Sequence, residues 1–215
     1  TRRCDRLLRW PANFTIALLD TVLLRLLFPA AAVGFAAVMA ERGIGLFNQV
    51  SAPGPVVIVT SMLLLDLTIY AQHVLLHRMP VLWRIHRMHH TDLDVDVTTG
   101  ARFHPLEIVL SMFIKCGVIA ISGAPAVAVL WFEVLLNACS MFNHANLRLP
   151  EQLDHIVRKL IVTPDMHRIH HSVRPTETNS NYGFNLSCWD RLFRTYTEAP
   201  AAGHEKMQLG LAECR

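Results

Sequence analysis

The 215-residue sequence has few charged residues: Asp, Glu, Lys and Arg make up 17% of it, against roughly a quarter in a typical soluble domain. Apolar residues make up 52%. The net charge of +3 is small, and no run rich in Lys and Arg alternates with aromatic residues, so no nucleic acid partner is expected. This composition predicts a single membrane-bound domain over residues 1–215.

Several common site motifs are also missing. The sequence has no H-E-x-x-H, which excludes a zincin, and no E-x-x-H, which argues against a carboxylate-bridged di-iron bundle. The acidic stretch at 92–96 resembles the start of a calcium loop, but Val97 and Phe103 replace the glycine and glutamate that such a loop needs. No C-x-x-C pair occurs, so we interpret the five cysteines as free thiols: Cys4, Cys116, Cys139, Cys188 and Cys214.

Long apolar stretches predict four membrane-spanning helices, at about residues 13–40, 55–76, 106–122 and 125–142. Basic residues, beginning with Arg2 and Arg3, gather before the first stretch, between the second and third, and after the fourth. Arg42 is the only basic residue in the two other loops. By the positive-inside rule, segments 73–105 and 143–196 then lie on the cytoplasmic side. Buried helices of a soluble bundle are the alternative.

Ionisable side chains interrupt the apolar stretches. Because charges inside a bilayer need partners or a cavity, most of these residues are expected to pair between helices. They are Asp20, Arg25, Asp66, Lys115 and Glu133.

Histidine is unusually frequent, and eight of the 12 histidines form three motifs. H-x3-H occurs at 73–77, and H-x2-H-H occurs at both 86–90 and 167–171. Residues i, i+3 and i+4 of a helix share a face, so each motif is expected to direct its imidazoles at one common point. A zinc site usually has four ligands, so eight histidines indicate two metal ions. Neutral imidazole suits iron, zinc, copper or nickel.

These motifs on a chain with several spans resemble the fatty acid hydroxylase/sterol desaturase superfamily. The segments RFHPLE at 102–107, NHANLRLP at 143–150, TPDMHRIHHS at 163–172 and NSNYGFNLSCWDRLFRTY at 179–196 extend the resemblance over about residues 65–196. The resemblance implies an all-α, polytopic membrane helical bundle with a histidine-lined di-metal site on the cytoplasmic side. It also implies an enzyme that uses O2 to hydroxylate or desaturate a lipid.

Carried over residue by residue, the resemblance makes nine histidines metal ligands: His73, His77, His86, His89, His90, His144, His167, His170 and His171. His104, Asp190 and Asn181 are candidates for an additional ligand or for groups that orient a ligand. The sequence departs from the family pattern at two positions. Arg148 stands where some members have a second histidine, and Arg194 stands where glycine is usual. His155 and His204 are expected at the surface.

The implied cofactors are two iron ions (Fe2+/Fe3+), with zinc as a substitute. No nicotinamide, flavin or haem module is recognisable, so electrons are expected from an external donor, either ferredoxin or cytochrome b5 with a reductase. The expected location is the bacterial inner membrane or the endoplasmic reticulum. A zinc-dependent membrane metalloprotein without oxygenase activity and a membrane cytochrome with bis-histidine haem are the competing functions. Sterol, fatty acyl chain, alkylglycerol, amino-acid lipid and carotenoid substrates all stay open.

Overall fold

The computed structural model describes residues 5–212, so Arg2, Arg3, Cys4 and Cys214 lie outside the described residues. Over this range the chain is helical, and its only β-structure is two isolated bridges, Ile161 with Leu186 and Ser172 with Leu209. The predicted all-α class is therefore confirmed. Cys116, Cys139 and Cys188 are free, as expected.

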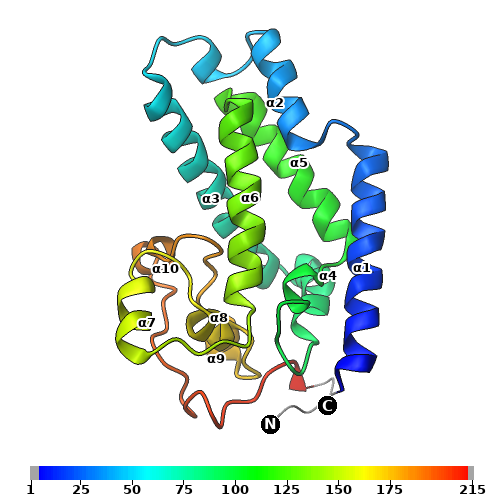
Figure 1. Cartoon of the computed structure of the whole chain (residues 1–215), viewed down its shortest axis with the longest axis vertical. Coiled ribbons are helices and arrows are strands. Elements are labelled where there is room, and N and C mark those ends of the chain that lie inside the picture. The colour runs from blue at the N-terminus through cyan, green and yellow to red at the C-terminus, as the bar shows by residue number, and fades with distance from the viewer. Residues whose placement is uncertain (1–4, 213–215) are drawn as a thin grey trace.

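Four long helices and the shorter α2 extend through the molecule in Figure 1, with α1 running along one side into the lower half: α1 (Arg6–Leu27), α2 (Ala31–Glu41), α3 (Gly54–Arg78), α5 (Pro105–Ser122) and α6 (Ala126–Asn143). They provide four segments long and apolar enough to cross a membrane, with α1 and α2 sharing the first segment, Arg9–Glu41. Only 17% to 33% of the residues in the most apolar part of each segment are buried. The apolar side chains therefore face outward, which suits lipid rather than the interior of a soluble bundle.

The first predicted span consists of two helices. Helix α1 ends where the amide of Phe28 donates to the carbonyl of Leu24, and Pro29 follows directly. Proline has no N–H to donate, and its ring clashes with the preceding turn, so the helix breaks there. After the break, α2 packs against α5 and α6. Its buried Ala32 and Ala36 join Leu65 of α3 and Phe132 of α6 in the hydrophobic core.

Short helices gather in the lower half of the molecule in Figure 1, at the level of the lower half of α1. They are α4 (Pro80–His90), α7 (Glu151–Val157), α8 (Pro164–His170), α9 (Pro175–Thr178) and α10 (Cys188–Leu192). The 3-10 helices η1 (Leu46–Asn48) and η2 (Thr99–Ala101) lie in connections. Proline occupies the first turn of α4, α5 and α8, where its missing N–H costs no hydrogen bond. These prolines thus mark where α4, α5 and α8 begin.

An arginine near the start of α1 binds the loop that follows α4. The guanidinium of Arg9 donates to both carboxylate oxygens of Asp92, at 2.6 and 2.7 Å, and to Asp96 at 3.1 Å. All three residues are buried. The acidic stretch at 92–96 therefore anchors α1.

The ionisable residues of the spans have different surroundings. Lys115 of α5 pairs with Glu133 of α6 at 2.5 Å, as expected for an interhelical pair. Asp66 of α3 instead accepts a hydrogen bond from the indole N–H of Trp189 at 2.7 Å. Arg25 is exposed, and Asp20 is buried beside a cavity.

Candidate metal centre

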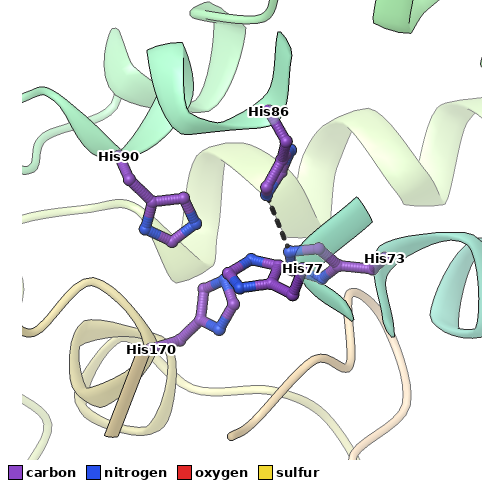
Figure 2. Close-up of side chains that lie close together, drawn as sticks. All are labelled: His73, His77, His86, His90 and His170. Atoms are coloured by element: carbon purple, nitrogen blue, oxygen red, sulfur yellow. Dashed lines mark hydrogen bonds between the residues drawn. The ribbon is translucent and has the colours of Figure 1, made fainter. Parts of the chain in front are cut away.

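The structure brings all nine predicted histidines together in two groups. In each group one ring nitrogen of every histidine lies within 4.8 Å of the others. The first group contains His73, His77, His86, His90 and His170, and the second contains His89, His144, His167 and His171. Figure 2 shows the rings of the first group turned toward a common space from α3, α4 and α8. All nine residues are at least nine-tenths buried.

The expectation that each motif points at one site is confirmed for His73 and His77, but it is wrong for the two H-x2-H-H motifs, which are each divided between the groups. In α4, His86 and His90 enter the first group and His89 the second. In and after α8, His167 and His171 enter the second group and His170 the first. Each residue of a helix advances by about 100°. Residues i and i+4 therefore stay together while i+3, about 100° from i+4, is directed to the neighbouring site.

Two histidines of the first group face each other through their Nε2 atoms. His73 Nδ1 lies 2.7 Å from the carbonyl of Tyr182, and His86 Nδ1 lies 2.8 Å from the carboxylate of Glu107. Both partners are acceptors, so each neutral ring carries its proton on Nδ1 and a lone pair on Nε2. These two Nε2 atoms are only 3.2 Å apart. Facing lone pairs repel unless a cation lies between them.

The second group repeats this arrangement. His89 Nδ1 donates to the carbonyl of Arg102 at 3.1 Å, and His144 Nδ1 donates to the carbonyl of Ser140 at 2.7 Å. Their Nε2 atoms are 3.1 Å apart. Burial lowers the pKa of His144 to about 4, and burial together with the neighbouring histidines holds the pKa of His89 well below its usual value. Both rings are therefore neutral at pH 7.

The nitrogen separations fit a metal in each group. His144, His167 and His171 place their Nε2 atoms 3.0 to 3.3 Å from one another. Nitrogens bound at about 2.0–2.1 Å to one metal, in tetrahedral or octahedral geometry, lie about 2.9–3.4 Å apart. Buried ring nitrogens of His77, His90 and His170 also have no hydrogen-bond partner, which a metal would supply. The donor set is thus suited to two metal ions.

The segment before α10 orients two of the histidines. The carbonyl of Ser180 accepts from His170 Nδ1 at 2.8 Å, just as the carbonyl of Tyr182 accepts from His73. Asp190 fixes this segment by accepting from the amides of Tyr182 and Gly183, both at 2.8 Å. Asn181 donates to the carbonyl of Met166 in α8 at 3.0 Å. Asp190 and Asn181 therefore act through the backbone and contact no histidine ring in these bonds.

Other histidines lie outside both groups. His104 precedes α5, and its Nδ1 accepts from the amide of Leu106 at 3.1 Å, which is a helix-capping role. His155 is exposed, as expected, and His204 is half-buried. Arg148, at the position of the family's extra histidine, extends outward to Glu205.

Three residues at the site carried no assigned role in the sequence analysis. Glu107 is 4% exposed and accepts a hydrogen bond from His86 Nδ1. In the sequence it is recognisable only as an acidic residue in the first turn of a helix. Phe103 stacks on His89 with ring centroids 4.5 Å apart. Trp83 packs against His77 at 5.0 Å. These aromatic rings shield the imidazoles from water.

A cavity of about 500 Å3 leads from the spans to the first group. Apolar side chains such as Leu24, Ile69 and Met112 line it, and His73 and His86 form part of its wall. Its size and lining suit an apolar ligand of small-molecule size.

Fold and site together define a membrane-spanning helical protein with two buried histidine clusters that could hold metal ions. Residues 58–195 match the fatty acid hydroxylase family, and the chain belongs to this family. No solved structure matches the chain.

Curated relatives include lipid-modifying enzymes from three kingdoms. The chain is 31% identical to ornithine lipid hydroxylase OlsE of Rhizobium tropici over 144 residues, which are 66% of this chain and 42% of that protein. It is 28% identical to human alkylglycerol monooxygenase over 148 residues, 68% of this chain and 31% of that protein. It is 32% identical to sphinganine C4-monooxygenase 1 of Arabidopsis thaliana over 141 residues, 64% of this chain and 53% of that protein. The matches thus span about half or less of these relatives.

Proposed function

We propose that the chain is an O2-dependent membrane monooxygenase that hydroxylates a lipid at two iron ions. Its nine clustered histidines would hold the metals, five in the first group and four in the second. The observation that carries this proposal is the close approach of Nε2 atoms in both groups, together with His73 and His86 of the first group in the wall of an apolar cavity. The hydroxylase and monooxygenase relatives favour hydroxylation over desaturation.

The chain's own residues prepare the site for this reaction. Bound iron would supply the redox chemistry that lets O2 attack an unactivated C–H bond. The carbonyls of Tyr182, Ser180 and Arg102 hold protons at Nδ1 of three histidines, which leaves Nε2 free. Glu107 does the same for His86 and adds a negative charge. The apolar wall of the cavity guides the lipid and excludes water.

The proposal also names the electron donor and the orientation of the chain in the membrane. An external donor, ferredoxin or cytochrome b5 with a reductase, would deliver electrons at the histidine end. We place that end in the cytoplasm because Arg84 and Arg87 of α4 lie there, whereas Arg42 is the only basic residue of the two opposite loops. The host membrane would be the bacterial inner membrane or the endoplasmic reticulum, and residues 1–215 would act as one domain.

A zinc-dependent metalloprotein is the competing function, because four histidines in the second group equal the usual coordination number of zinc. The test is expression in medium supplied with iron and without added zinc, followed by metal analysis and a spectroscopic search for coupled iron. The purified protein is then given O2, a reductant system and a panel of lipids. The proposal predicts coupled iron and a hydroxylated lipid, while an iron-loaded protein that forms no O2-dependent product would contradict it.

A further inference from the structure

Polar side chains interrupt the apolar wall of the cavity. Three of them have a buried oxygen without a hydrogen-bond partner: Oδ1 of Asp20, Oε1 of Gln72 and Oε2 of Glu107. An amide oxygen and the oxygens of an ionised carboxylate only accept hydrogen bonds. Leaving a buried acceptor unpaired costs free energy. The wall is therefore complementary to a ligand that brings several hydrogen-bond donors.

The charges on the wall narrow the class of ligand. Among the described residues, Lys115 is the only lysine or arginine that lines the cavity, and its ammonium already binds Glu133 at 2.5 Å. Glu107 is engaged with His86 through its other oxygen. Asp20 is 7% exposed, lines the same cavity as Glu107, and has a buried oxygen without a hydrogen-bond partner. A positively charged donor would balance it.

We propose that Asp20 binds the ammonium group of an amine-bearing lipid, with the free oxygens of Gln72 and Glu107 accepting its further hydrogen bonds. This inference rests on the proposed function, because it names the class of lipid that the cavity presents to the metals. Glu107 contacts His86. The amine end of the lipid therefore points toward the first histidine group, and the far end of its chain points away from it.

Equilibrium binding tests this proposal without turnover. Metal-loaded protein in phosphatidylcholine nanodiscs, kept free of O2 and reductant at pH 7, is titrated with octadecylamine, N-acetyl-octadecylamine and octadecanol. A charge-assisted hydrogen bond is about twice as strong as a neutral one. The wild-type protein should bind the amine at least about tenfold more tightly than the alcohol, a difference of about 1.4 kcal/mol.

Matched variants assign the preference to one carboxyl group. Asp20→Asn keeps the shape and removes the charge, so it should lose most of the preference for the amine while its affinity for octadecanol changes less than about twofold. Asp20→Glu should keep the preference. Glu41→Gln is the control, because Glu41 is an exposed carboxylate at the end of α2 and does not line the cavity.

Three results would overturn the proposal. Equal affinity of the wild-type protein for amine and alcohol would show that a neutral donor suffices. Equal affinity for the amine and its N-acetyl derivative would show that charge is not recognised. An undiminished preference in Asp20→Asn would assign recognition to another group. If amine selectivity holds but no lipid is oxidised when O2 and reductant are supplied, the proposed function fails and this inference stands.

Discussion

The carboxylate of Glu107 should strengthen metal binding by one histidine group and leave the other group unaffected. It accepts a hydrogen bond from His86 Nδ1 at 2.8 Å, and both side chains are buried. This bond fixes the tautomer that leaves Nε2 free and makes the ring a stronger ligand. Glu107→Gln keeps the size of the side chain and removes its charge. It therefore weakens the hydrogen bond to His86 without creating a cavity.

The size of the effect follows from the hydrogen bond. A bond to a charged group contributes about 1.5–3 kcal/mol, and a neutral one about 1 kcal/mol. Replacing the carboxylate by an amide therefore costs about 0.5–2 kcal/mol of metal-binding free energy, or a factor of about 2–30 in the dissociation constant. Residues that support metal ligands commonly contribute a factor of about 10–100.

Competition with a calibrated chelator, followed by metal analysis, measures this loss. We expect one of the two metal ions to leave the Glu107→Gln variant at a lower chelator concentration than in the wild-type protein. Glu133→Gln is the matched control, because Glu133 lines the same cavity but pairs with Lys115 and not with a histidine. Unchanged affinity for both metals in Glu107→Gln, or an equal loss in Glu133→Gln, would refute the reasoning.

Four further predictions concern stability and are checked by unfolding the protein in detergent. Asp190→Ala leaves the amides of Tyr182 and Gly183 without acceptors and should cost about 4 kcal/mol; a loss below about 1 kcal/mol would contradict this. Arg9→Met leaves the buried Asp92 and Asp96 unpaired and should cost about 3–5 kcal/mol, whereas an unchanged stability would show that the anchor is dispensable. Arg194 is exposed with φ of 60°, a conformation that glycine adopts freely. Arg194→Gly should therefore raise the free energy of unfolding by about 1 kcal/mol, and a lower free energy of unfolding would contradict strain at this residue. Burial lowers the pKa of His144 to about 4, so below about pH 6.5 the unfolded chain binds more protons than the folded one. The metal-free protein should therefore be most stable above pH 6.5 and lose about 1.4 kcal/mol per pH unit for each such histidine as the pH falls toward 4; an unfolding midpoint equal at pH 7.5 and 5.5 would contradict it.

The sequence predicts the helices well because their signals are local. Apolar length marks the four spans, and prolines at positions 80, 105 and 164 mark where three helices at the site begin. Pro29 lies inside the first predicted span and marks the break between α1 and α2. The direction that α2 takes after this break depends on its packing against α5 and α6, which local sequence does not reveal. The structure also explains why glycine is usual at position 194, because the residue there has a positive φ.

Helical spacing separates one histidine of each H-x2-H-H motif from the other two, but it does not reveal which motifs combine to form each group. His89 and His90 are neighbours in sequence but join different groups, because about 100° separates their side chains around α4, and the histidines that each one meets come from α3, α8 and the end of α6. The groups that orient the rings are mostly backbone carbonyls, such as those of Ser180 and Tyr182, which no side-chain pattern reveals. Asp190, a candidate for orienting a ligand, accepts a hydrogen bond from the amide of Tyr182. The carbonyl of Tyr182 in turn accepts from His73 Nδ1, so Asp190 is connected to His73 through the backbone.

Counting metal ions per chain tests the central claim most directly. After iron reconstitution, the wild-type protein should hold two ions per chain. Replacing His77 and His90 with alanine, which removes ligands from the first group only, should leave one ion. Replacing His167 and His171, both in the second group, should also leave one. A single ion in the wild-type protein, or the loss of both ions in either double variant, would contradict two separate histidine groups.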